Sequence, residues 1–275
     1  MEHFESHFDG YQGLSLYLQG WQAEKPKAVM ALVHGFGEHS GRYMNVVNKL
    51  VPAGFTVVSF DHRGHGKSPG KRGHVMDWNE FTEDVELFLK HLQGQQRDLP
   101  IFLMGHSMGG LIVLIYAISN QGALKGLIAS APLLAQPAIS PVLVFISRIL
   151  SKIWPGFSID TKLDVNSISR DPEAIEAYKQ DPLVHSIASA RFGTELTAAM
   201  EWAQAHADEL KMPLLVLHGA ADPLVPEQGS ATFFENASSK NKTRNLYPDG
   251  LHEPHNDLDR EKVTDDLLNW LNAHL

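Results

Sequence analysis

A serine lies at the centre of the strongest chemical motif in the sequence. Residues 105–109 read GHSMG, which is a Gly-x-Ser-x-Gly pattern, and they lie between an apolar run at 101–104 and an apolar helical stretch at 108–119. A tight turn between a strand and a helix is the context that exposes such a serine as a nucleophile. Glycine is needed on either side because side chains there would collide with the neighbouring strand and helix. We therefore expect Ser107 to be a nucleophile rather than an incidental serine in a glycine-rich turn.

A serine nucleophile requires a general base and an acid that orients the base. Asp222 and His252 each lie just beyond a late apolar run, and the chain order Ser, Asp, His is the one expected for this kind of nucleophile. Each has a simpler explanation: an Asp-Pro pair often only begins a turn, and His255 is a rival base in a chain with 15 histidines. Because both residues follow strands, we predict Ser107, His252 and Asp222 as the catalytic triad.

A second glycine-rich loop could stabilise the negative charge that develops during an attack by serine. Residues 34–37 read HGFG and follow the apolar run 28–33 directly. A backbone N–H in such a loop, together with the N–H of the residue after the nucleophile, can donate to an oxyanion. We predict Phe36 and Met108 as this pair. On its own such a turn is more often a plain strand exit, so the prediction depends on its position relative to Ser107.

Two further motifs do not support a site. Residues 252–255 (HEPH) depart from the zinc motif His-Glu-x-x-His, because the second histidine comes one residue early and Pro254 prevents the required helix. Residues 66–68 (GKS) end like a phosphate-binding loop, but the glycine needed at position 61 is an aspartate. We therefore predict no metal site and no nucleotide site.

The reactive residues require a sheet whose strands end at a common edge. Apolar runs typical of strands alternate with helical patterns, which predicts a mainly parallel sheet covered by helices on both faces. The first twenty residues lack the pattern of a secretory signal and indicate a hairpin. The expected strands are 14–18, 28–33, 55–60, 101–104, 124–130, 214–218 and 243–247, and the expected helices are 42–51, 78–93, 108–119, 227–235 and 259–273.

The alternation of strands and helices breaks once, between Pro132 and about Leu210. No strand-like run is visible there, only helical patterns interrupted by prolines. Ligands of open α/β sheets bind at the carboxyl ends of the strands, so this insertion would form a lid above the site. We divide the chain into a core of residues 1–131 and 211–275 and a helical cap of residues 132–210.

Residues 142–154 of the cap are apolar but shorter than the ~20 residues that a membrane-spanning helix needs. As a helix they would place Ser147, Arg148, Ser151 and Lys152 on one narrow face. Two explanations stay open: burial against other helices, or contact with lipid, in which the two cations face anionic head groups and give weak, salt-sensitive binding. The side chains predicted to contact substrate or lipid are Phe145, Ile146, Ile149 and Ile153.

The composition excludes several classes of function. The chain carries 32 acidic and 23 basic side chains, a net charge of −9, which disfavours binding to nucleic acid. It contains no cysteine, so disulfides, thiolate metal sites and a thiol nucleophile are excluded. We expect a cytoplasmic protein without a transmembrane segment, whose only membrane contact is peripheral and made through the cap.

Taken together, these residues make the whole chain resemble the monoacylglycerol lipase and lysophospholipase group of α/β hydrolases, which are serine aminopeptidase-like hydrolases. Residues 34–43 (HGFGEHSGRY) look like that group's oxyanion segment, and residues 60–68 (FDHRGHGKS) look like its strand-exit segment. Residues 169–173 (SRDPE) and 178–184 (YKQDPLV) are similar to its cap. The resemblance implies an α/β-hydrolase fold and the hydrolysis of monoacylglycerol or lysophospholipid esters without a cofactor. The animal enzymes have cysteines near the site, so thiol-directed inhibition does not carry over to this chain.

Other functions could use the same residues. A carboxylesterase, thioesterase or peptidase needs the same triad, and a non-catalytic binding protein can share the scaffold. A peptidase acting at a free amino terminus would present carboxylates near its pocket, whereas residues 132–154 contain no acid. Complete loss of activity would free the three triad positions to change, yet all three residue types are present in order. The sequence therefore favours a lipid ester substrate and an active enzyme.

Overall fold

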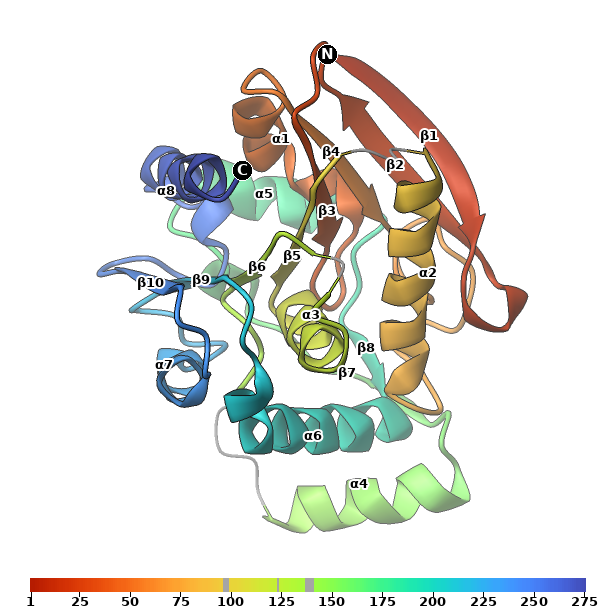
Figure 1. Ribbon diagram of the computed structural model, residues 1–275. Coiled ribbons are helices and arrows are strands. Elements are labelled where there is room, and N and C mark those ends of the chain that lie inside the picture. Colours follow the sequence, from red (N-terminus) through yellow and green to blue (C-terminus); the bar gives the residue numbers. More distant parts are fainter. Residues whose placement is uncertain (96–98, 123, 137–140) are drawn as a thin grey trace.

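An eight-stranded sheet forms the centre of the computed structural model, which describes residues 1–95, 99–122, 124–136 and 141–275, with only the backbone for residues 141–144 (Figure 1). The strand order is β1-β2-β4-β3-β5-β6-β9-β10. β1 and β2 form an antiparallel hairpin, β2 is antiparallel to β4, and all other pairs are parallel. The strands are β1 (Glu2–Asp9), β2 (Ser15–Gln22), β3 (Ala28–Val33), β4 (Phe55–Phe60), β5 (Ile101–His106), β6 (Gly126–Ser130), β9 (Leu214–Gly219) and β10 (Lys242–Tyr247).

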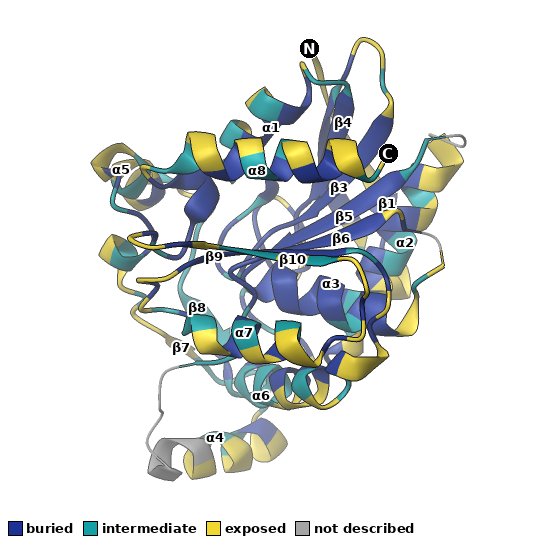
Figure 2. Ribbon diagram, turned by 60° about the vertical axis from the view of Figure 1, so that its left-hand side comes forward, coloured by how far each residue is buried: buried dark blue, intermediate teal, exposed yellow. Residues whose placement is uncertain are grey.

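Helices cover both faces of the sheet, so its central strands are buried on both sides (Figure 2). In β3 the alternate residues divide between two cores: Val29 faces the core that contains α2 and α3, and Met30 faces the core that contains α1 and α8. This explains why the strands read as continuous apolar runs. The helices of the core are α1 (Met44–Leu50), α2 (Asn79–Gln95), α3 (Met108–Ser119), α7 (Glu227–Asn236) and α8 (Arg260–Ala273).

The chain between β6 and β9 places α4 and α6 in a layer at the bottom of Figure 1, whereas α5 lies in the upper part of that view. The expectation that it contains no strand is wrong, because two short strands pair antiparallel, with Ser158 opposite Ser189. Each has only three residues, which is too short to give a period-two pattern. The segment contains α4 (Pro141–Ile153), β7 (Ser158–Asp160), α5 (Pro172–Gln180), β8 (Ile187–Ser189) and α6 (Ala190–Ala205).

Short 3₁₀ helices occur in the connecting loops, and several of these loops surround the site. The outermost long helix, α4, packs on α6, where the Ser151 and Thr194 hydroxyls lie 2.8 Å apart. We keep the interpretation of residues 132–210 as a cap. The 3₁₀ helices are η1 (Tyr11–Gly13), η2 (Ser40–Arg42), η3 (Val165–Ser167), η4 (Ala207–Glu209) and η5 (Pro254–Asn256).

Candidate active site

Ser107 lies at the sharp turn between β5 and α3, with a backbone φ of 53°. This left-handed conformation is strained for a residue with a side chain. The turn is possible because its neighbours are glycines: a Cβ on Gly105 would lie 2.2 Å from the carbonyl oxygen of Gly109, and a Cβ on Gly109 would lie 2.3 Å from that of Val33. The steric reason given for the glycines in the sequence motif is therefore confirmed.

The three predicted triad residues meet at the carboxyl ends of β5, β9 and β10. His252 Nε2 lies 2.9 Å from Ser107 Oγ, and His252 Nδ1 lies 2.7 Å from Asp222 Oδ2. Since an ionised carboxylate only accepts hydrogen bonds, Nδ1 carries the proton and Nε2 is free to accept the hydroxyl proton of the serine. All three residues are buried.

The charges around His252 prepare it to hold a proton. Burial opposes the charged imidazole, but the Asp222 carboxylate outweighs it, with help from Glu253 and Glu38, and the pKa of His252 is raised above its ordinary value. Burial would raise the pKa of Asp222, yet the neighbouring His252 and hydrogen-bond donors lower it. Its second oxygen accepts the backbone N–H groups of Leu224 and Val225 at 2.9 and 3.0 Å. Asp222 is therefore ionised over the physiological range.

His255, the rival base, makes different contacts. Its ring is fully buried and stacks on Tyr43, with ring centres 4.8 Å apart, and it also contacts His106. Neither ring nitrogen of His255 has a hydrogen-bond partner among the described residues. Burial lowers its pKa. Its ring therefore packs as part of the core, while His252 alone of the two contacts Ser107.

The loop that contains Phe36 lies against the serine. A Cβ on Gly35 would be 3.2 Å from Ser107 Cβ, and the Gly35 N–H donates to Glu38 Oε1 at 2.6 Å. The Phe36 ring stacks on Phe192 of α6, with centres 5.0 Å apart. Met108 is the first residue of α3, where backbone N–H groups have no partner within the helix and carry partial positive charge. Phe36 thus lies in the loop after β3 and Met108 at the start of α3, so both predicted oxyanion residues follow the carboxyl ends of neighbouring strands.

A buried ionic network that the sequence analysis did not assign joins two of these loops. The Arg42 guanidinium donates to both carboxylate oxygens of Glu253, at 2.6 and 2.9 Å, and to Glu38 at 2.9 Å. It also lies over the Tyr178 ring of α5, 4.5 Å from the ring centre. The charge of Arg42 lowers the pKa of Glu253 against the opposing effect of burial. The oxyanion loop, the histidine loop and the cap are therefore connected through one cation.

A mostly apolar cavity of about 660 Å³ lies within the cap, between α4, α6 and the β7–β8 pair. Its described lining includes Ile146 but not Phe145, Ile149 or Ile153, which are 64%, 42% and 79% exposed. Ile146 is itself 45% exposed, so the cavity includes one of the four predicted cap residues while all four are accessible on α4. Helix α6 links the cavity to the site, because Phe192 contacts Phe36 while the next turn lines the cavity. The lining also includes large apolar residues that were not among the predicted site residues, namely Leu150, Phe157, Ile159 and Leu196.

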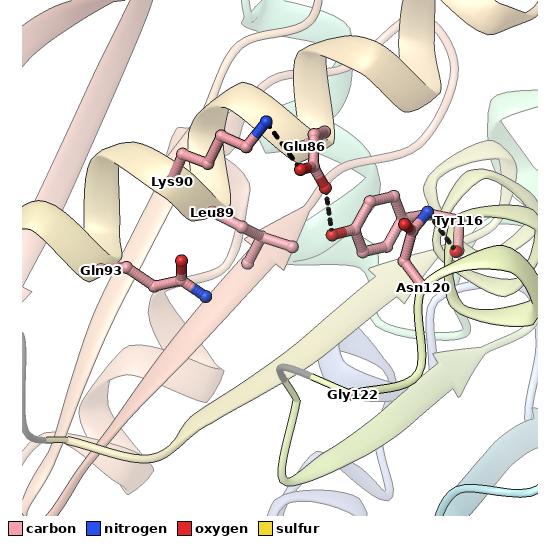
Figure 3. A pocket seen from close by; sticks show the side chains of 7 residues that line it. All are labelled: Glu86, Leu89, Lys90, Gln93, Tyr116, Asn120 and Gly122. Atoms are coloured by element: carbon pink, nitrogen blue, oxygen red, sulfur yellow. Dashed lines mark hydrogen bonds and ion pairs between the residues drawn. The ribbon is translucent and has the colours of Figure 1, made fainter.

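A polar depression of about 330 Å³ between α2 and α3 lies far from this chemistry (Figure 3). Tyr116 donates there to Glu86 at 2.5 Å. Because α3 begins beside Ser107 and rises 1.5 Å per residue, Asn120 at this depression is about 20 Å away along the helix. The depression is therefore not part of the site.

The described part of the chain lacks two other kinds of feature. It contains no group of three or more histidine, aspartate or glutamate side chains placed to hold a metal ion. None of its helices combines the length and the apolar content needed to cross a membrane.

Comparisons with known proteins agree on one group. Residues 24–259 match a hydrolase family described as serine aminopeptidase, S33. A monoacylglycerol lipase of Mycolicibacterium smegmatis is 37% identical over 98% of both chains, and the human monoglyceride lipase is 33% identical over 97% of this chain and 88% of its own. The crystal structure of a Paleococcus ferrophilus monoacylglycerol lipase superposes over the full length of both chains with a TM-score of 0.85 and 36% identity.

Proposed function

This chain belongs to the serine aminopeptidase (S33) family of α/β hydrolases and is a serine hydrolase of lipid esters, and from this we propose that it cleaves monoacylglycerols through Ser107, His252 and Asp222. The observation that carries the proposal is the hydrogen-bonded series from Ser107 through His252 to Asp222, at 2.9 and 2.7 Å. Monoacylglycerol is favoured over other lipid esters because relatives at 36–37% identity over the whole chain are monoacylglycerol lipases.

In the acylation step, His252 Nε2 accepts the Ser107 proton while the serine oxygen attacks the ester carbonyl carbon. The Phe36 and Met108 N–H groups stabilise the oxygen that becomes negative, and ionised Asp222 stabilises the imidazolium. The imidazolium then protonates the leaving glycerol oxygen as the ester bond breaks. Glycerol departs and the fatty acyl group stays on Ser107.

In the deacylation step, neutral His252 accepts a proton from water, and the resulting hydroxide attacks the acyl carbonyl. Collapse of the second tetrahedral intermediate returns the proton to Ser107 and releases the fatty acid. Every proton transfer uses the same imidazole, so no metal or organic cofactor is required.

We propose further that the cap receives the acyl chain and contacts a lipid surface. The apolar cavity supports a role in binding the acyl chain, because moving methylene groups from water into an apolar environment lowers the free energy. Helix α4 supports the contact with a lipid surface, because Phe145, Ile149 and Ile153 are exposed although they are large and apolar, as is Trp154 directly after the helix. Arg148 and Lys152 are exposed on the same helix and would approach anionic head groups.

The experiment that tests the proposal compares substrates with the purified protein. We expect the highest kcat/KM for a long-chain monoacylglycerol, a lower value for a lysophospholipid and the lowest for an aminoacyl naphthylamide. Ser107→Ala should lower kcat by about 10⁶-fold while the far-ultraviolet circular dichroism stays unchanged. A preference for the aminoacyl amide, or ester hydrolysis that survives in a folded Ser107→Ala variant, would contradict it.

A further inference from the structure

The loop that contains His252 is built around a buried carboxylate. Asp257 is fully buried, and its Oδ2 accepts the backbone N–H of Leu251 at 3.0 Å, directly before His252. Its Oδ1 accepts the N–H of the next residue, Leu258, at 2.8 Å, so the carboxylate is held locally while its other oxygen spans the loop to Leu251. Such bonds to a charged acceptor are stronger than neutral ones. The peptide on the amino side of His252 is therefore fixed by Asp257.

Residues 168–171 of the cap hold the other side of the loop that contains His252. The backbone carbonyl of Ile168 accepts the Glu253 N–H at 2.8 Å, directly after His252. Arg170 donates to Asp257 twice, from its backbone N–H at 2.7 Å and from Nε at 3.0 Å. These residues belong to the cap segment 168–171, which overlaps the SRDPE motif. The peptides on both sides of His252 thus depend on a contact between the cap and the core.

We propose that Asp257 is a positioning residue for His252, and that the cap segment 168–171 completes its support, so that catalysis requires this part of the cap to be docked. The inference rests on the proposed role of His252 as general base. It extends that role by assigning to Asp257 and Arg170 a function in the reaction although neither touches the serine or Asp222.

His252 needs this support because catalysis tolerates only a small displacement of its imidazole. His252 must keep hydrogen bonds of 2.9 and 2.7 Å to two different loops at once, and a displacement of 1 Å can cost on the order of 100-fold in rate. The backbone N–H groups of the two residues that flank His252 bond to Asp257 and to the cap, and neither bonds to a strand or helix of the sheet core. The carboxylate takes the place of a strand or helix in holding it still.

The first variant is Asp257→Asn, which keeps the shape of the side chain but places an NH₂ group against one of the backbone donors. We expect kcat for a short soluble ester to fall by about 10- to 100-fold while KM changes less than about 2-fold. Asp259→Asn is the matched control. Asp259 accepts a hydrogen bond from Nη2 of the same arginine, Arg170, at 2.6 Å. Its side chain is half exposed, and no hydrogen bond joins it to the loop of His252 among the described residues. It should keep kcat within about 2-fold of wild type.

The second measurement separates positioning from general loss of structure. In a His252→Ala background no imidazole is left to position, so adding Asp257→Asn should change the residual hydrolysis of an activated ester less than about 2-fold. An equal fold-loss in both backgrounds would show that Asp257 acts on the whole fold and would overturn the inference.

Arg170→Gln provides a second test of the proposal if Asp257→Asn does not fold. It removes the Nε bond from a partly exposed side chain and leaves the backbone bond, so we expect a smaller loss of kcat, about 3- to 10-fold, again without a change in KM. Wild-type kcat in Arg170→Gln would contradict the role of the cap. If the wild-type protein hydrolysed no ester at all, the proposed function would fail instead.

Discussion

The imidazole of His252 is buried, yet carboxylates surround it. Ionised Asp222 is hydrogen-bonded to it, and Glu253 and Glu38 add negative charge nearby. This arrangement stabilises the imidazolium that must form when the serine attacks, and it explains why the pKa of His252 is raised although burial alone would lower it. The residue can therefore stabilise the proton that it accepts from Ser107.

The raised pKa of His252 predicts the pH dependence of the reaction. The free enzyme needs neutral His252, so kcat/KM should be high above this pKa and fall as pH decreases through it, with a midpoint above the ordinary value of about 6.5. The measurement is kcat/KM for a soluble ester from pH 5 to 9, with circular dichroism at each pH. A flat profile in a folded protein would contradict a histidine base.

His252 and His255 should respond differently to substitution. His252→Ala removes the base and should lower kcat about as much as loss of the serine, because triad members act as a unit. His255→Ala leaves the base but removes a fully buried ring that stacks on Tyr43, so it should lower the free energy of unfolding by about 2–3 kcal/mol while most of kcat remains. Kinetics and urea unfolding of both variants test this, and the opposite pattern would reassign the base.

At the scale of elements, the turn between β5 and α3 is defined by close contacts between backbones. A Cβ at Gly109 would meet the Val33 carbonyl oxygen at 2.3 Å, which neither strand nor helix can relieve by a change of rotamer. The nucleophile is therefore exposed because three backbone segments approach each other at glycines.

Gly109→Ala should accordingly destabilise the protein by about 3 kcal/mol and reduce activity, since overpacking is added at a strained turn. The matched control is Gly94→Ala in α2, where an added Cβ meets nothing within 4 Å and should raise stability by about 0.5–1 kcal/mol. Chemical denaturation of both variants gives the comparison. Equal stability of Gly109→Ala and wild type would show that the turn is not limited by this contact.

The sequence predicts the elements whose patterns are local. The buried strands and the helices that cover them are apolar with a clear period, and the hydrolase fold is confirmed by the sheet and by the match to the family. The extent of β1 could not be predicted because this edge strand is almost entirely exposed and polar. The β7–β8 pair was missed because each strand has three residues and depends on a partner 27 or more positions away.

Some residues of the candidate site are predictable from local sequence patterns and others are not. Ser107, Asp222 and His252 are recognisable because each follows a strand, and the structure brings them within hydrogen-bond distance. Arg42 and Asp257 carry no comparable signal, because their roles depend on partners up to 211 residues away, such as the bond between Arg42 and Glu253. Only the fold shows which charges are paired.

At the scale of the whole molecule, the outermost helix leaves several large apolar side chains exposed. Ser151 of α4 is buried against α6, whereas Phe145, Ile149 and Ile153 are exposed. A helix on the surface of a globular protein normally buries its apolar stripe. The net charge of −9 would repel an anionic membrane. Arg148 and Lys152 of α4 are positively charged and would reduce this repulsion locally.

Vesicle binding should therefore depend on α4. Ile149→Ser and the double variant Arg148→Glu/Lys152→Glu should each weaken co-sedimentation with vesicles that contain anionic lipid, and high salt should weaken the wild type too, because two cations contribute only about 1 kcal/mol each. Met76→Ser, which removes an exposed apolar side chain outside the cap, is the control and should have no effect. If both α4 variants keep wild-type binding and long-chain preference, α4 does not contact the membrane.

Covalent labelling tests most directly whether Ser107 is an activated nucleophile. A fluorophosphonate probe reacts with a serine whose hydroxyl is activated by a base, not with a binding pocket. We predict one adduct per chain, mapped by mass spectrometry to the peptide that contains Ser107, absent from Ser107→Ala and formed far more slowly in His252→Ala. A folded wild-type protein that takes up no probe, or an adduct that persists in Ser107→Ala, would contradict it.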